Sequence, residues 1–300
     1  MKKNTNTILL VILLVLLSAF VATKVFRTPS RDRNLDMKVL VADTTQIAVI
    51  ELSLPGHDDG LVLERKDSAW RVVEGGRSAP AARFTVRNAL RNLASMRPER
   101  IVTRNEESWK KYDITDSAAV RIIARGRDGA SMGDWFIGKE SQGATYVRRG
   151  NNPTVYAVDG YLRNIYNKSF NDWRDRLFLL LDEKQARKLT FNYPGDSSFV
   201  LSRADSGWTV ENVAADSAKV ARYLNKLRFK ELSKFVDEVP AEDPDATLTI
   251  SLDAGDPVVV RGWKREDAWI LNSTVQPDAW FRDSMFVRNL FAGRNDFLVD

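Results

Sequence analysis

The chain carries one pattern of apolar residues twice, behind a single apolar segment near its N-terminus. Val86, Ala89, Leu90 and Leu93 reappear at a constant offset as Val220, Tyr223, Leu224 and Leu227. The run Tyr161–Tyr166 likewise reappears as Phe286–Phe291. This period is far longer than the roughly 20 to 50 residues of solenoid repeats, so we interpret it as a duplicated domain.

Each copy is predicted to combine an antiparallel sheet with few helices. Strands, or in two places a strand or turn, are predicted over residues 47–54, 61–65, 69–73, 100–103, 120–124, 135–138, 145–148 and 155–158 of the first copy, and over 189–193, 199–203, 207–211, 234–237, 248–252, 258–262, 269–271 and 279–281 of the second. The repeated apolar spacing predicts one longer helix per copy, with Pro80 at an early position of the first and Asp216 as N-cap of the second. A short amphipathic helix closes each copy. Because no βαβ alternation is present, the predicted fold class is α+β, with two tandem antiparallel-sheet-plus-helix units.

The apolar segment predicts a membrane anchor. Ile8–Ala22 contains no charged residue, and residues 5–23 would span roughly 28 Å as a helix, close to the thickness of the hydrocarbon layer. Cleavage after Ala22 or Ala19 would place Phe20 or Leu17 at the minus-three position, where secretory signals carry a small residue. An uncleaved single span is therefore favoured over a secretory signal. We therefore expect a signal anchor over residues 1–27, a linker over 28–42, a first repeat over 43–181 and a second over 182–300.

The flanking charges leave the orientation of this anchor open. Two lysines precede the segment and four basic residues follow it, and a strict count places the large domain in the cytoplasm. Long domains, however, translocate largely regardless of flanking charge. We favour a single-pass protein of the cytoplasmic (inner) membrane with the lipid bilayer as partner of Ile8–Ala22 and the large C-terminal domain outside the cytoplasm.

The composition argues against several classes of protein. Residues 1–38 hold seven basic and two acidic side chains, which accounts for the whole formal net charge of +5. The remaining chain is formally neutral and has no arginine-rich stripe, so nucleic acid is not an expected partner. The absence of cysteine from the sequence removes disulfides, thiolate nucleophiles and cysteine-based zinc sites.

Three patterns that could carry chemistry have simpler structural interpretations. The spacing of Gly133 and Gly138–Lys139 matches a phosphate loop, but the residues between are typical of a strand and Glu140 replaces the Ser or Thr that magnesium needs. His57, the single histidine, lies beside Asp58 and Asp59 in a predicted hairpin turn. Paired acids such as Glu106 and Glu107 are expected to form salt bridges or caps. We therefore predict no catalytic residue, no cofactor-binding residue and no metal ligand.

Seven of the eight tryptophans divide into two groups. Five fall within predicted strands, where packing in the core is favoured over a sugar-stacking surface: Trp70, Trp135, Trp208, Trp269 and Trp280. Trp109 and Trp173 lie between elements. Together with Arg174, these two are the candidates for exposed contact with a partner.

The residues also resemble a known family. Trp70–Val102, Trp109–Ile114, Ile137–Lys139, Tyr146–Arg148, Val155–Val158 and Trp173–Leu177 are similar to the bacterial family called domain of unknown function 4340. The resemblance covers residues 43 to 300, twice over, and consists of core and turn positions. Genes of that family often accompany a gliding-type ABC-2 transporter, which implies a permease and a GldG-like subunit as partners.

Two functions remain open. The resemblance implies a non-catalytic, membrane-tethered extracytoplasmic accessory protein of an ABC-2 transporter, which predicts an apolar surface patch and co-purification with the permease. The alternative is an envelope glycan-binding protein or hydrolase, which predicts a deep pocket with converging carboxylates or His57. A scaffold that bridges the membrane and the cell wall is a third option.

Overall fold

A computed structural model describes residues 12–18, 35–57, 59–237 and 239–299. Most of the predicted anchor Ile8–Ala22 lies outside the described residues, and so do residues 28–34 of the predicted linker. Residues 12–18 are helical and exposed. Among the residues that the structure describes, no helix is both long enough and apolar enough to cross a membrane.

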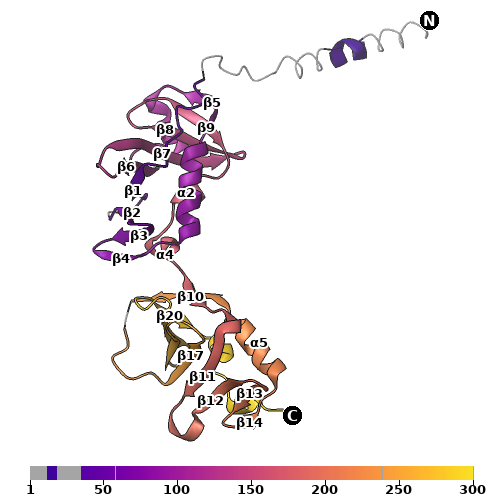
Figure 1. The fold of residues 1–300 in the computed structure, drawn as a ribbon. Helices are drawn as coiled ribbons and strands as arrows, with labels where there is room; N and C mark the ends of the chain where they lie inside the picture. Colours follow the sequence, from indigo (N-terminus) through magenta and orange to yellow (C-terminus); the bar gives the residue numbers. More distant parts are fainter. Residues whose placement is uncertain (1–11, 19–34, 58, 238, 300) are drawn as a thin grey trace, which may run out of the picture. The chain divides into compact units, whose positions relative to one another are not determined.

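The chain divides into two compact units, 1–173 and 174–300. The first contains a nine-stranded antiparallel sheet in the order β4-β3-β2-β1-β6-β7-β8-β9-β5 (Figure 1). Its elements are β1 (Ile47–Ser53), β2 (Leu61–Lys66), β3 (Ala69–Glu74), β4 (Arg77–Pro80), α2 (Arg83–Ser95), β5 (Pro98–Thr103), η1 (Glu106–Tyr112), β6 (Val120–Gly126), β7 (Ser131–Ser141), β8 (Ala144–Arg149), β9 (Val155–Asp159), α3 (Arg163–Tyr166) and α4 (Phe170–Trp173).

The second unit repeats this plan in a nine-stranded sheet of the order β14-β13-β12-β11-β17-β18-β19-β20-β16. Its elements are β10 (Leu177–Leu180), η2 (Glu183–Gln185), β11 (Ala186–Asn192), η3 (Gly195–Ser197), β12 (Phe199–Ala204), β13 (Gly207–Val210), β14 (Val213–Ala214), α5 (Ser217–Leu227), β15 (Phe229–Glu231), β16 (Phe235–Val236), β17 (Ala246–Leu252), β18 (Val258–Lys264), β19 (Trp269–Ser273), β20 (Trp280–Asp283), α6 (Val287–Leu290) and η4 (Arg294–Phe297). The two strand orders correspond position by position. The prediction of mostly antiparallel sheets with few helices is therefore confirmed.

One helix lies along a face of each sheet and buries the repeated apolar stripe. Val86, Ala89 and Leu93 of α2 are buried, and Leu90 is half-buried against the same core. In α5 all four stripe residues are buried, and the carboxylate of Asp216 accepts hydrogen bonds from the backbone N–H groups of Ala218 and Lys219. The predicted N-cap of α5 is therefore confirmed.

Two details of the prediction differ from the structure. Pro80 does not begin the helix; it ends β4, where it pairs with Arg71 of β3. β4 is an edge strand, and such a strand tolerates a residue without an N–H donor. The boundary between the units lies between Trp173 and Arg174, earlier than 181/182, because β10 pairs with β15 of the second unit.

A buried tyrosine joins the long helix to the short one in each unit, but from opposite sides. Tyr166 of α3 donates its hydroxyl to the carbonyl of Ala89 in α2, at 2.9 Å. Tyr223 of α5 donates instead to the carbonyl of Leu290 in α6, at 2.6 Å. The position equivalent to Ala89 thus carries the large ring in the second unit, and the two cores are filled by different side chains.

These tyrosines predict alkaline sensitivity. Burial raises the pKa of Tyr166 and Tyr223 above the ordinary value of about 10. Above pH 10 the unfolded chain loses the hydroxyl protons that the folded chain keeps. The contribution of the two tyrosines to the free energy of unfolding is therefore fully present below pH 10 and falls as the pH rises above it. Each tyrosine should lower the free energy of unfolding by about 1.4 kcal/mol per pH unit.

Urea unfolding between pH 8 and 11 measures this effect. The double variant Tyr166→Phe/Tyr223→Phe should be less stable at pH 8, because two hydrogen bonds are lost, yet show a flatter decline above pH 10. Equal slopes for the variant and the parent chain would contradict the assignment.

Candidate functional site

Trp173 is not an exposed contact, and this prediction was wrong. Its side chain is fully buried in the core of the first unit, and its backbone carbonyl accepts a hydrogen bond from Ala82 N at 2.7 Å. Phe170, three residues earlier on α4, is buried in the same core. The spacing of these two aromatic residues puts both on the inner face of the short helix.

Arg174 is also buried, so the prediction that it is exposed was wrong. Its guanidinium carbon lies 3.7 Å from the centre of the Phe235 ring, and Nη1 lies 4.0 Å from a carboxylate oxygen of Asp237. Phe235 belongs to β16, far away in the sequence. Arg174 therefore has a structural role at the start of the second unit.

Trp109 is half-buried and held in place by the first unit. Its indole N–H donates to the carbonyl of Pro153 at 3.1 Å, and the guanidinium of Arg148 lies over its ring at 4.0 Å. Of the three candidate contacts, Trp173 and Arg174 are thus buried and Trp109 is half-buried.

Arg148 is a buried cation that the sequence did not single out. The side chain is 2 % exposed and stacks on Phe136, with its carbon 3.6 Å from the ring centre. It donates hydrogen bonds to the carbonyls of Ile114 and Gly150 and to the carboxylate of Asp116. Desolvation lowers the pKa of Arg148 from its usual value. These contacts fix the turn after η1 onto β8.

The glycines of the phosphate-loop pattern have packing roles. Gly133 and Gly138 both lie within β7, as the strand interpretation predicts. A Cβ atom on Gly133 would overlap the ring of Trp135, and one on Gly138 would overlap the carbonyl oxygen of Tyr112. Glycine at both positions therefore permits a close approach between strand and neighbour.

His57 lies in an exposed turn, as predicted. Its backbone N–H donates to the carbonyl of Leu54 at 3.2 Å. Throughout the part of the chain that the structure describes, no group of three His, Cys, Asp or Glu side chains is placed to hold a metal ion.

An apolar pair is exposed on the two-stranded sheet of the second unit. Leu180 of β10 and Phe229 of β15 are directly paired across the strands, and they are 58 % and 56 % exposed. Paired side chains on one face form a small continuous surface, in contrast to single exposed apolar residues, which are ordinary. We call Leu180 and Phe229 the apolar pair.

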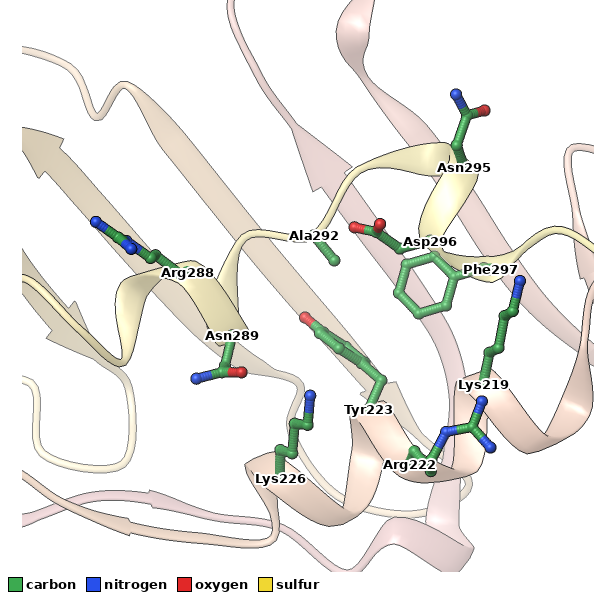
Figure 2. Close-up of a pocket in the computed structure, with 10 residues that line it drawn as sticks. All are labelled: Lys219, Arg222, Tyr223, Lys226, Arg288, Asn289, Ala292, Asn295, Asp296 and Phe297. Carbon is green, nitrogen blue, oxygen red and sulfur yellow. The ribbon is translucent and has the colours of Figure 1, made fainter.

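A basic groove of about 570 Å³ lies in the second unit. One wall is α5, with Lys219, Arg222 and Lys226; the other is the segment from α6 to η4 (Figure 2). That second wall carries Arg288, Asn289, Asn295 and Asp296, and the buried ring of Tyr223 lies between the walls. We call this site the basic groove.

The charges of the basic groove are unequally satisfied. Lys219 donates to the carbonyl of Leu298 at 2.9 Å, and Asp296 accepts a hydrogen bond from the N–H of Gly293 at 2.8 Å. Arg222, Lys226 and Arg288 have exposed side chains and form no ion pair with any residue that the structure describes. The sequence could have indicated one wall of the groove, because the spacing of Lys219, Arg222 and Lys226 puts them on the polar face of α5. The residues of the facing wall could not be predicted from the sequence.

Comparison with known proteins gives one family. The family model described as Domain of unknown function (DUF4340) matches residues 70–250, from β3 of the first unit to β17 of the second. No curated protein and no solved structure matches the chain.

Proposed function

Since the chain belongs to the DUF4340 family, we propose that it is a non-catalytic, membrane-tethered extracytoplasmic accessory protein of a gliding-type ABC-2 transporter. The observation that carries this proposal is the role of the residues behind the family resemblance. Gly138, Arg148 and Trp173 all hold the fold together by close packing or buried hydrogen bonds. The residues behind the resemblance therefore stabilise the fold, and this supports a protein that acts by binding partners.

The apolar pair offers a surface for such contact. Leu180 and Phe229 lie on a two-stranded sheet that is separate from the nine-stranded sheet. The nine-stranded sheet therefore does not require apolar side chains to be exposed at these two positions. Burying both against a permease or a GldG-like subunit would remove apolar surface from water and stabilise the complex. The uncharged segment Ile8–Ala22 supports a tether that keeps this surface close to the membrane.

Affinity purification of the tagged full chain from detergent-solubilised membranes tests the proposal. The permease and the GldG-like subunit should co-purify, and Leu180→Asp/Phe229→Asp should lower their recovery at least about tenfold, because two charges would be buried unpaired. The matched control is Phe84→Asp/Val213→Asp, which places the same charges on two exposed apolar positions elsewhere. Its recovery should equal that of the parent chain.

Three results would contradict the proposal. The first is a chain that purifies alone from membranes that contain the transporter. The second is equal recovery from the two aspartate variants. The third is turnover of an envelope glycan that is lost on a single polar substitution such as His57→Asn, which would favour the hydrolase alternative.

A further inference from the structure

We propose that the basic groove binds a phosphorylated sugar or polyol. This site is lined by other residues than the apolar pair and does not depend on the association with a transporter.

The cations of the basic groove are suited to phosphate. Arg222 and Lys226 are one turn apart on α5, and Arg288 belongs to the other wall, where its side chain extends away from α5 (Figure 2). A phosphate group has enough oxygens to accept hydrogen bonds from several sides, and an arginine fork can bind two of them at once. A volume of about 570 Å³ is within the usual range of small-molecule sites.

The other polar groups indicate that the ligand also carries hydroxyls. Asn289 and Asn295 present side-chain amides, which both donate and accept hydrogen bonds. Asp296 would repel a second anion, but its carboxylate can accept a hydrogen bond from a hydroxyl group. Cations beside neutral amides and one carboxylate therefore fit a phosphate attached to a polyhydroxylated body.

The first unit shows that the fold does not require these charges. At the constant offset of the duplication, Lys219, Arg222 and Lys226 correspond to Thr85, Asn88 and Asn92, which are uncharged. Arg163 corresponds to Arg288, but it donates hydrogen bonds to the carbonyls of Ala118 and Ile137. The same scaffold thus folds with a neutral helix face and an arginine that is used internally.

The charges of the second unit also carry a small cost. Arg222 and Lys226 are like charges at i and i+4, a spacing that destabilises a helix. A ligand that neutralises them would remove this repulsion. A binding role thus accounts for both their presence and their lack of ion pairs with the described residues.

Isothermal titration calorimetry on the full chain in phosphatidylcholine nanodiscs tests the site, with glucose 6-phosphate, glycerol 3-phosphate, glucose and inorganic phosphate as probes. A phosphorylated probe should bind saturably at one site, at least about tenfold more tightly than phosphate, while glucose should not bind. Arg222→Met/Lys226→Met should weaken binding at least about tenfold, as expected for lost charge-assisted hydrogen bonds. The control Lys188→Met/Arg261→Met removes the same charges from strands β11 and β18 and should change the affinity less than about twofold.

A second variant separates hydroxyl recognition from charge. Asp296→Ala, which removes the carboxylate acceptor, should reduce the preference for the phosphorylated probe over inorganic phosphate, while phosphate itself binds equally well or better. Nanodiscs that contain phosphatidylglycerol identify the source of the ligand. If that lipid blocks the soluble probe, the occupant is a lipid headgroup; if it does not, the occupant is a free or glycan-borne phosphate.

The proposal is overturned if neither phosphorylated probe binds, or if binding survives Arg222→Met/Lys226→Met. It is also overturned if the control pair weakens binding equally, because the effect would then be one of net charge. An unchanged preference in Asp296→Ala would remove the sugar or polyol part. All the substituted side chains except Arg261, which is half-buried, are exposed, and circular dichroism verifies that the variants fold.

Discussion

Replacement of Trp135 by alanine is expected to lower the free energy of unfolding of the first unit by about 3–5 kcal/mol, the range for a buried large aromatic residue. Trp135 is fully buried in β7, and its indole N–H donates to the carbonyl of Leu40 at 2.9 Å. The substitution leaves a cavity and a buried carbonyl without its donor. Urea unfolding of the full chain, with hydrogen exchange read by mass spectrometry, should show the loss of protection in residues 35–173.

Gly133 provides a sharper test of the same packing. A methyl group at this position would overlap the Trp135 ring, so Gly133→Ala alone should destabilise the first unit by about 1–3 kcal/mol. In the Trp135→Ala background the methyl group enters the space that the ring has left. The double variant should therefore be more stable than the sum of the single effects predicts, and strict additivity would contradict this geometry.

Replacement of Arg148 by methionine is the second large effect, with an expected loss of about 2–5 kcal/mol from the first unit. The carbonyls of Ile114 and Gly150 would each lose a charged donor, and a buried acceptor left without a partner costs about 1–3 kcal/mol. Methionine keeps much of the apolar contact with Phe136, so the loss reports mainly on hydrogen bonding. The same unfolding and exchange measurements apply.

Two controls separate the carbonyl contacts of Arg148 from its ion pair. Asp116 is 79 % exposed, so Asp116→Asn should cost no more than about 1 kcal/mol. Arg127→Met removes an exposed arginine from the turn between β6 and β7 and should be neutral. If Asp116→Asn were as damaging as Arg148→Met, the ion pair and not the carbonyls would hold the turn.

The sequence predicted best the helices and strands in which apolar residues recur at the spacing of one face of that helix or strand. The stripe of Val220, Tyr223, Leu224 and Leu227 fits only a helix with one buried face, and the Asp216 cap stands directly before it. Pro80 failed as a guide because its fixed φ suits both a helix start and an edge strand. Local conformation alone could not choose between these two.

Burial of single residues was the weaker part of the prediction. Trp173 and Arg174 lie between elements, where no periodicity tells which side faces the core. Both are buried because of distant segments: Trp173 in a core that includes α2, and Arg174 against Phe235 of β16. Arg148 was missed for the same reason, since its partners come from the turn after η1 and from β7.

The sequence by itself determined the duplication, the antiparallel sheets and the helix faces, because those properties follow from the spacing of apolar residues along one segment. Only the tertiary structure decided which polar side chains form hydrogen bonds within the protein and which remain exposed to a ligand. Arg163 and Arg288 occupy equivalent positions in the two copies. Arg163 donates hydrogen bonds to backbone carbonyls, whereas Arg288 lines the basic groove. That difference depends on what the neighbouring elements place within hydrogen-bond distance, which no local pattern encodes.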